Sequence, residues 1–284
     1  MWLGILLAAS SAFCFSTLGI WGKLAAQFGL VSSSLLVWRF GLVAAALFLV
    51  GYGRGFKPLE RLVMIAFGLA YFVFTALYFG ALERISAGTA SLLVYLAPVS
   101  VVVIQALLGK RPSQIQLIAT GLAVAGLLVI IGIPSAKDAN VLGVLLGAMA
   151  GIGYGGYLVF SETQRHIPPL AFTAHGALGT TIGFAVLSLL NGWTRVPDTL
   201  PAWGLIAAMA IISTLLALPM LYASIARIGA ARASLISTLE PVFATLLAWW
   251  ILAESPRLET LLGAVLILGG AALASLSRQS SSDK

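Results

Sequence analysis

Long apolar runs, separated by short segments rich in charge, glycine and proline, occupy almost the whole chain. A helix needs about 20 apolar residues to span the roughly 30 Å hydrocarbon layer of a membrane. Strands of a membrane barrel would alternate polar and apolar residues, and these runs do not. The pattern therefore predicts an all-α integral membrane protein with ten transmembrane helices. The predicted spans lie near residues 2–22, 32–52, 60–81, 86–108, 114–133, 141–161, 169–190, 202–223, 231–252 and 258–277.

Composition removes the alternative of a soluble protein. Of the 284 residues, 60% are hydrophobic and 9% are charged, whereas a soluble domain has about 25% charged residues. The net charge of +7 comes from lysines and arginines scattered between apolar runs, so nucleic acid is not an expected partner. Cys14 is the only cysteine, which excludes an internal disulfide and a cysteine-based metal site. No cofactor and no metal site are predicted.

The loops on the two sides of the predicted bundle differ in charge. The side of the N-terminus holds the larger share, namely Arg54, Lys57, Arg61, Lys110, Arg111, Arg165, Arg227, Arg232, Arg278 and Lys284. The opposite side holds Lys23, Arg84, Lys137, Arg195 and Arg257, while Arg39 falls inside the second span. Because Lys and Arg are enriched in cytoplasmic loops, both termini are expected in the cytoplasm.

The chain contains an internal repeat. A shift of 143 residues aligns RISAGTASLLVYLAPV, from Arg84, with RIGAARASLISTLEPV, from Arg227, and pairs Pro98 with Pro241. The alignment predicts two five-helix halves, residues 1–137 and 138–284. Because five is odd, the second half is expected to be inverted in the membrane. Inverted repeats are typical of alternating-access transporters that bind substrate near the midplane, although duplication also occurs in membrane proteins that transport nothing.

Residues of the second half resemble a known family. The segment SLISTLEPVFATLLAWWILAES, residues 234–255, followed by LLGAVLILGGAAL from Leu261, is similar to the signature of the drug/metabolite transporter superfamily, specifically its ten-helix EamA-type exporters. The first half is similar but has Lys110 where the second half keeps Glu254 of the family's Gly-Glu pair. The resemblance implies a multi-pass protein of a bacterial-type inner membrane that exports amino acids or similar small amphipathic metabolites. It does not identify the solute.

The two matched prolines are the first candidates for a transport pathway. Pro98 and Pro241 lie well inside apolar runs, where each removes a backbone donor and weakens the helix at the preceding turn. Irregular backbone at membrane depth is tolerated only against protein or a water-filled cavity. These positions are therefore expected to face the pathway as hinges, with a static kink as the alternative.

Three ionisable side chains lie at depth, where such groups normally face a cavity or a partner. Glu240, directly before Pro241, is interpreted as a group that binds a substrate ammonium or exchanges a proton; alternatively, it is protonated and hydrogen-bonded to the broken backbone. Arg39 is interpreted as a partner of a substrate carboxylate or of Glu240, unless its stem extends to the outer interface. His175 is a candidate proton carrier, or else a satisfied contact between helices.

Aromatic and hydroxyl side chains complete the predicted pathway. Tyr71, Phe74 and Tyr78 follow one another at helical spacing, and two further tyrosines, Tyr95 and Tyr222, lie mid-span. Their hydroxyls need partners in a dry environment. Together with the hydroxyls of Ser91, Ser234, Ser237 and Thr238, which would line the pathway as hydrogen-bonding groups, these aromatic residues favour an amphipathic solute. For any single aromatic residue, packing between helices is the alternative. Gly143, Gly147, Gly151 and Gly155 share one helix face and predict close helix packing.

Other classes of membrane protein lack support in the sequence. It has no HExxH pair, no intramembrane aspartate pair and no Gly-x-Ser-x-Gly elbow, so an intramembrane enzyme is the weaker alternative. A channel or a scaffold is the other alternative. The sequence therefore predicts a secondary transporter and not an enzyme, with a small molecule and membrane lipid as partners. Proton coupling and the oligomeric state stay open.

Overall fold

The computed structural model describes residues 1–28, 32–131, 140–192, 196–252 and 258–276, and every regular element in these ranges is helical. Eight helices are long and apolar enough to cross a membrane, and two shorter apolar helices occupy Ser33–Leu49 and Gln114–Ile130. The prediction of an all-helical membrane protein is confirmed. The count of ten crossings stays a prediction.

Several of the expected spans are divided into two helices. The helices are α1 (Trp2–Ser16), α2 (Leu18–Gln27), α3 (Ser32–Leu49), α4 (Pro58–Leu82), α5 (Ala87–Val94), α6 (Ala97–Leu107), α7 (Gln114–Ile131), α8 (Val141–Ser161), α9 (Pro169–Leu190), α10 (Leu200–Ala210), α11 (Ala217–Ile228), α12 (Ala230–Ser237), α13 (Glu240–Leu252) and α14 (Leu258–Leu276). A 3-10 turn, η2 (Glu162–Gln164), follows α8. A π-helical segment, η3 (Ile211–Leu216), joins α10 to α11.

Proline explains where the breaks before α6 and α13 fall. Pro98 is the second residue of α6 and Pro241 the second residue of α13, so each break lies directly before a residue that has no N–H to donate to the preceding turn. The wide turns of η3 precede Pro219 in the same way. Whether the two matched prolines act as hinges stays a prediction.

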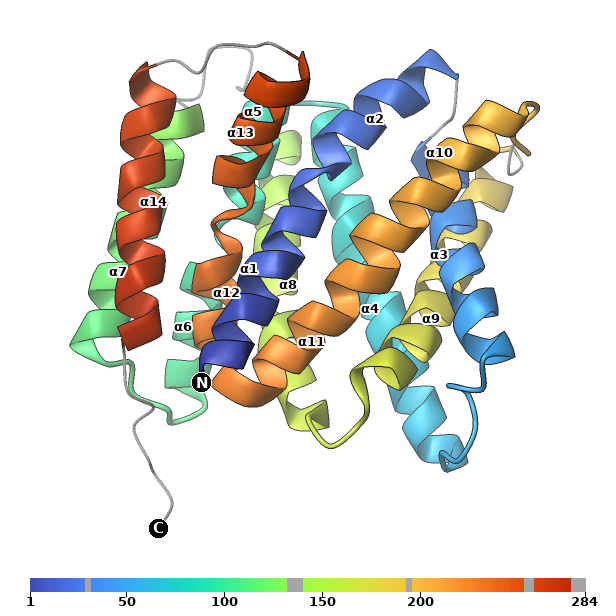
Figure 1. Cartoon of the computed structure of the whole chain (residues 1–284), viewed down its shortest axis with the longest axis horizontal. Coiled ribbons are helices and arrows are strands. Elements are labelled where there is room, and N and C mark those ends of the chain that lie inside the picture. The colour runs from blue at the N-terminus through green and yellow to red at the C-terminus, as the bar shows by residue number, and fades with distance from the viewer. Residues whose placement is uncertain (29–31, 132–139, 193–195, 253–257, 277–284) are drawn as a thin grey trace.

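The helices form two layers closed by two edges (Figure 1). The helices α1, α11, α12 and α13 lie in front in this view, and α4, α5, α6 and α8 lie behind them. Within the front layer α1 packs against α11, α12 and α13, and within the back layer α8 packs against α4, α5 and α6. The pair α7 and α14 closes one edge, and the pair α3 and α9 closes the other.

Glycines allow the edge helices to approach backbone to backbone. A methyl group at Gly126 of α7 would lie 2.6 Å from the Gly263 carbonyl oxygen of α14, and one at Gly263 would lie 2.5 Å from the Gly126 oxygen. On the other side of the bundle, a methyl at Gly68 of α4 would lie 2.0 Å from the Gly176 oxygen of α9. Such distances leave no room for a side chain at these positions.

The glycine face predicted on the sixth span is confirmed as a packing face. Added methyl groups at Gly147 and Gly151 of α8 would clash with Leu93 of α5, and one at Gly155 would lie 2.6 Å from Ser100 Cβ of α6. This face holds α8 tightly against the broken helix pair of the back layer.

The loops after α3, α6, α8 and α11 all lie at the end of the bundle where α1 begins (Figure 1). They carry Arg54, Lys110, Arg111 and Arg165, and we call this the basic end. Other residues of the charge comparison lie outside the described residues, namely Lys137, Arg195, Arg257, Arg278 and Lys284, as does Glu254 of the family signature.

Candidate functional site

Tyr71, at mid-length of α4, is the centre of a group of polar and aromatic side chains between the layers. Its ring lies 5.5 Å from that of Phe40 on α3, 4.8 Å from Phe74 and 5.7 Å from Tyr157 on α8. Its hydroxyl lies within electrostatic range of both Arg39 and Glu240. Tyr71 therefore lies near both Arg39 and Glu240, the two groups of opposite charge that the sequence places at this depth.

Arg39 is held inside the protein and not at the interface. The side chain is 4% exposed. Its Nε donates to Thr214 Oγ1 over 2.6 Å, its Nη2 donates to the Ser213 carbonyl over 2.7 Å, and the guanidinium lies 4.9 Å from the centre of the Phe40 ring. The alternative of a stem that extends to the outer interface is therefore wrong, because η3 supplies acceptors in the interior.

The guanidinium is only partly engaged by these bonds. Arginine carries five N–H donors, and no acceptor for Nη1 is found among the described residues. Arg39 and Glu240 form no ion pair with each other in the same part of the chain. Within the described residues, part of the donor capacity of the guanidinium is therefore not used.

Glu240, the first residue of α13, is half-buried between the layers. Its carboxylate lies within electrostatic range of the hydroxyls of Tyr71, Tyr78, Tyr95 and Tyr154. No hydrogen bond or ion pair of its side chain is found within the described ranges, so the alternative of a bond to the broken backbone gains no support. A role of Glu240 in binding an ammonium ion or exchanging a proton stays a prediction.

Most of the serine and threonine hydroxyls predicted beside the pathway already have hydrogen-bond partners in the protein. Ser234, Ser237 and Thr238 each donate to a carbonyl of their own helix, over 2.9, 2.9 and 2.6 Å. Ser91 lies 3.3 Å from the hydroxyl of Tyr78. Tyr78 and Tyr95 are half-buried near Glu240. The structure thus brings these tyrosines toward Glu240, while a substrate role for Ser234, Ser237 and Thr238 stays a prediction.

Tyr222 belongs to an aromatic cluster nearer the basic end. Its hydroxyl is hydrogen-bonded to that of Tyr157, and its ring lies 4.6 Å from Phe172. Both tyrosines are buried and lie in the last two turns of helices that end at the basic end, α8 and α11. The cluster therefore fills the space between Tyr71 and that end.

His175 lies apart from these residues. It is 2% exposed on α9, its Nδ1 lies 3.0 Å from the Ala171 carbonyl, and its ring packs edge-on against Phe48 and Phe56. This environment agrees with a satisfied contact between α3 and α9. A role as proton carrier stays a prediction that the geometry does not favour.

Several site residues were absent from the sequence interpretation. Tyr154 and Tyr157 are two tyrosines three residues apart in an otherwise apolar span, the same signal that selected Tyr71 and Tyr78. Ser213 and Thr214 gave no signal, because their importance comes from Arg39, which is distant in sequence. Among the described residues, no group of three or more His, Cys, Asp or Glu is suited to hold a metal ion.

Comparison with known proteins agrees with this architecture. The model of the EamA-like transporter family matches residues 2–132 and 141–276. The chain is 28% identical to the protein named uncharacterized transporter YcbK of Bacillus subtilis (strain 168), over 81% of this chain and 78% of that protein. It is 30% identical to an uncharacterized transporter of Archaeoglobus fulgidus, over 73% of this chain and 74% of that protein.

A solved crystal structure has the same fold. It matches with a TM-score of 0.78 at 23% sequence identity, and the alignment covers 96% of each chain. At this identity the likeness concerns the fold alone. Together, the family match over both halves and the two transporter relatives identify the class of the protein. The chain belongs to the EamA-like transporter family of the drug/metabolite transporter superfamily.

Proposed function

We propose that this protein is a secondary transporter that exports amino acids or similarly amphipathic metabolites from the cytoplasm. The observation that carries the proposal is the pair of opposite charges, Arg39 and Glu240, that both lie within electrostatic range of the Tyr71 hydroxyl. Arg39 keeps donors for a carboxylate, and Glu240 has no protein partner among the described residues. A zwitterionic amino acid carries the complementary carboxylate and ammonium groups. The tyrosine and phenylalanine rings at and around Tyr71 suit the apolar side chain of such a solute.

Packing that repeats between the halves supports alternating access. The contact of Gly143 in α8 with Ile85 recurs as the contact of Gly4 in α1 with Ile228, and these isoleucines are matched by the internal repeat. In the same way, Gly126 faces Gly263 across the α7–α14 edge, and their repeat equivalents Gly270 and Ala119 also face each other. Both relations are expected of inverted repeats about an axis in the membrane plane.

The two layers pack closely at one end of the bundle and not at the other, which supports a transporter in one of its two alternating states. At the basic end α12 of the front layer packs against α6 and α8 of the back layer. The repeat-equivalent packing would be α5 against α13 and α1, and within the described ranges no comparable packing is found. We infer that the layers are closed at the basic end, which we assign to the cytoplasm, and are apart at the opposite end.

Counterflow into proteoliposomes tests the proposal. Vesicles are loaded with unlabelled leucine, and entry of labelled leucine is followed with added competitors: the amine that lacks the carboxylate and the acid that lacks the ammonium. We expect saturable, counterflow-stimulated entry that both competitors inhibit much less than leucine does. Equal inhibition by the amine would remove the proposed carboxylate site. Unsaturable ion current would instead identify a channel.

A further inference from the structure

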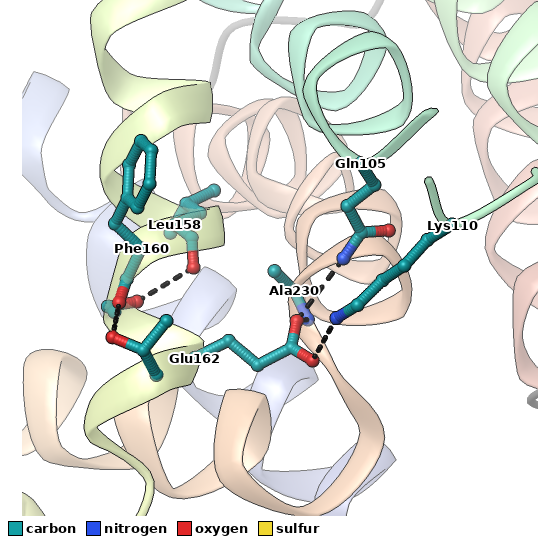
Figure 2. Close-up of polar contacts among 8 residues, drawn as sticks. Gln105, Lys110, Leu158, Phe160, Glu162 and Ala230 are labelled. Carbon is teal, nitrogen blue, oxygen red and sulfur yellow. Dashed lines mark hydrogen bonds and ion pairs between the residues drawn. The ribbon is translucent and has the colours of Figure 1, made fainter. Parts of the chain in front are cut away.

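Glu162 makes a set of contacts that the transport site does not use. It is the first residue of η2, directly after α8. Figure 2 shows its carboxylate between three groups: Oε1 accepts from Lys110 Nζ over 3.2 Å, and Oε2 accepts from Gln105 Nε2 over 3.2 Å and from the backbone N–H of Ala230 over 2.9 Å. The side chain is only 14% exposed although it lies at the basic end.

These contacts join the two layers. Gln105 lies on α6 and Lys110 in the loop after it, so both belong to the back layer with Glu162 itself. Ala230 is the first residue of α12, in the front layer. From these contacts we propose that Glu162 is a latch that holds the layers together at the basic end, and that it must release Ala230 before the pathway can open there. The inference rests on the proposed function.

The internal repeat explains why α12 depends on a distant carboxylate. In the first half, Ser86 caps α5 by accepting from the Thr89 N–H over 3.2 Å. The matching residue in the second half is Gly229, which has a φ of +81° and no side chain to cap α12. An exposed helix N-terminus favours negative charge. Glu162 therefore supplies from another helix what Ser86 supplies locally.

A second contact joins the same two segments. Tyr157, on α8 directly before η2, is hydrogen-bonded to Tyr222 of α11. Both links thus connect α8 to the segment that runs from α11 into α12. At the opposite end, the described ion pair is of another kind. Glu83 contacts its neighbour Arg84 over 3.1 Å, its side chain is 74% exposed, and the pair joins no two helices. Glu83 is therefore a suitable control.

Cysteine accessibility tests the latch without any substrate. In a Cys14→Ser background, Ser237→Cys places a thiol on α12 between the latch and Glu240. Thiol reagent applied from the basic side should react slowly in the parent. In Glu162→Ala it should react about tenfold faster, the factor expected for loss of one hydrogen bond to a charged group. Glu83→Ala should leave the rate unchanged.

A conservative variant distinguishes loss of the latch from loss of folding. Glu162→Gln keeps an oxygen acceptor for Ala230 but loses the charge that attracts Lys110, so an intermediate rate is expected. Parent-like rates in both Glu162 variants, in protein that elutes as a folded species, would overturn the latch. Because no transport is measured, an increased rate would support the latch even if the counterflow assay failed, and the reverse result would leave the transport proposal intact.

Discussion

The Nε of Arg39 donates to Thr214 Oγ1 over 2.6 Å, and this bond joins α3 to the π-helical segment between α10 and α11. The wider turns of a π-helix occur frequently at functional sites. Here the segment also offers the Ser213 carbonyl to the same guanidinium. The two bonds fix the orientation of the Arg39 guanidinium, which we propose binds the substrate carboxylate.

Arg39→Lys should therefore reduce transport while the charge is kept. A lysine ammonium cannot reproduce the planar fork that reaches Thr214, Ser213 and a ligand together. We expect leucine counterflow to fall at least about tenfold, since a hydrogen bond to a charged group contributes about 1.5–3 kcal/mol. Arg61→Lys, at an exposed position of α4, is the matched control. Parent rates in Arg39→Lys would show that the fork is not needed.

Glu240→Gln should abolish or strongly reduce transport with little effect on folding. Glutamine keeps the shape of the side chain, and no protein partner of Glu240 is lost among the described residues. The variant removes the charge that would bind an ammonium or carry a proton. Transport rate and its pH dependence are measured alongside thermal stability in detergent. Parent rates with the parent pH dependence would eliminate Glu240 from substrate binding and ion coupling.

Gly126→Ala should destabilise the protein, because the new methyl group would lie 2.6 Å from the Gly263 oxygen and 2.8 Å from Ile267. Overpacking of this kind costs about 1–3 kcal/mol. Gly121→Ala on the same helix, α7, meets nothing within 4 Å and should be neutral or stabilising by a few tenths of a kcal/mol to about 1 kcal/mol. The midpoint of thermal unfolding in detergent is compared for the two. Equal midpoints would contradict the close edge packing.

Topology is tested by thiol labelling in intact cells with a Cys14→Ser background. Ala87→Cys lies at the start of α5, away from the basic end, and His166→Cys lies in the loop after η2 at the basic end; both residues are exposed. A membrane-impermeant reagent should label the first in intact cells and the second only after permeabilisation. The opposite pattern would reverse the orientation and with it the direction of export.

Local sequence was enough to predict that the chain is helical and where its apolar segments lie, but not that several of the expected spans are divided into two helices. An apolar run in lipid must satisfy its own backbone hydrogen bonds, so its only option in a single segment is a helix. The same reasoning applies to Pro98 and Pro241, which lack an N–H wherever they lie, and to the spacing-four glycines of α8, which share one face through helix geometry alone. Glu240 was also predictable, because its depth follows from its position within a span.

The partners of these residues were decided by the tertiary structure. Nothing near Arg39 in sequence indicates that Ser213 and Thr214 accept its protons, since η3 reaches it only when α10 packs on α3. In the sequence, Glu162 is an ordinary charged residue at the end of a span. Only the fold brings Lys110, from the loop after α6, and Ala230, from the start of α12, to its carboxylate. Helix formation depends on neighbours a few residues apart, whereas binding and closure depend on which helix faces meet across the layers.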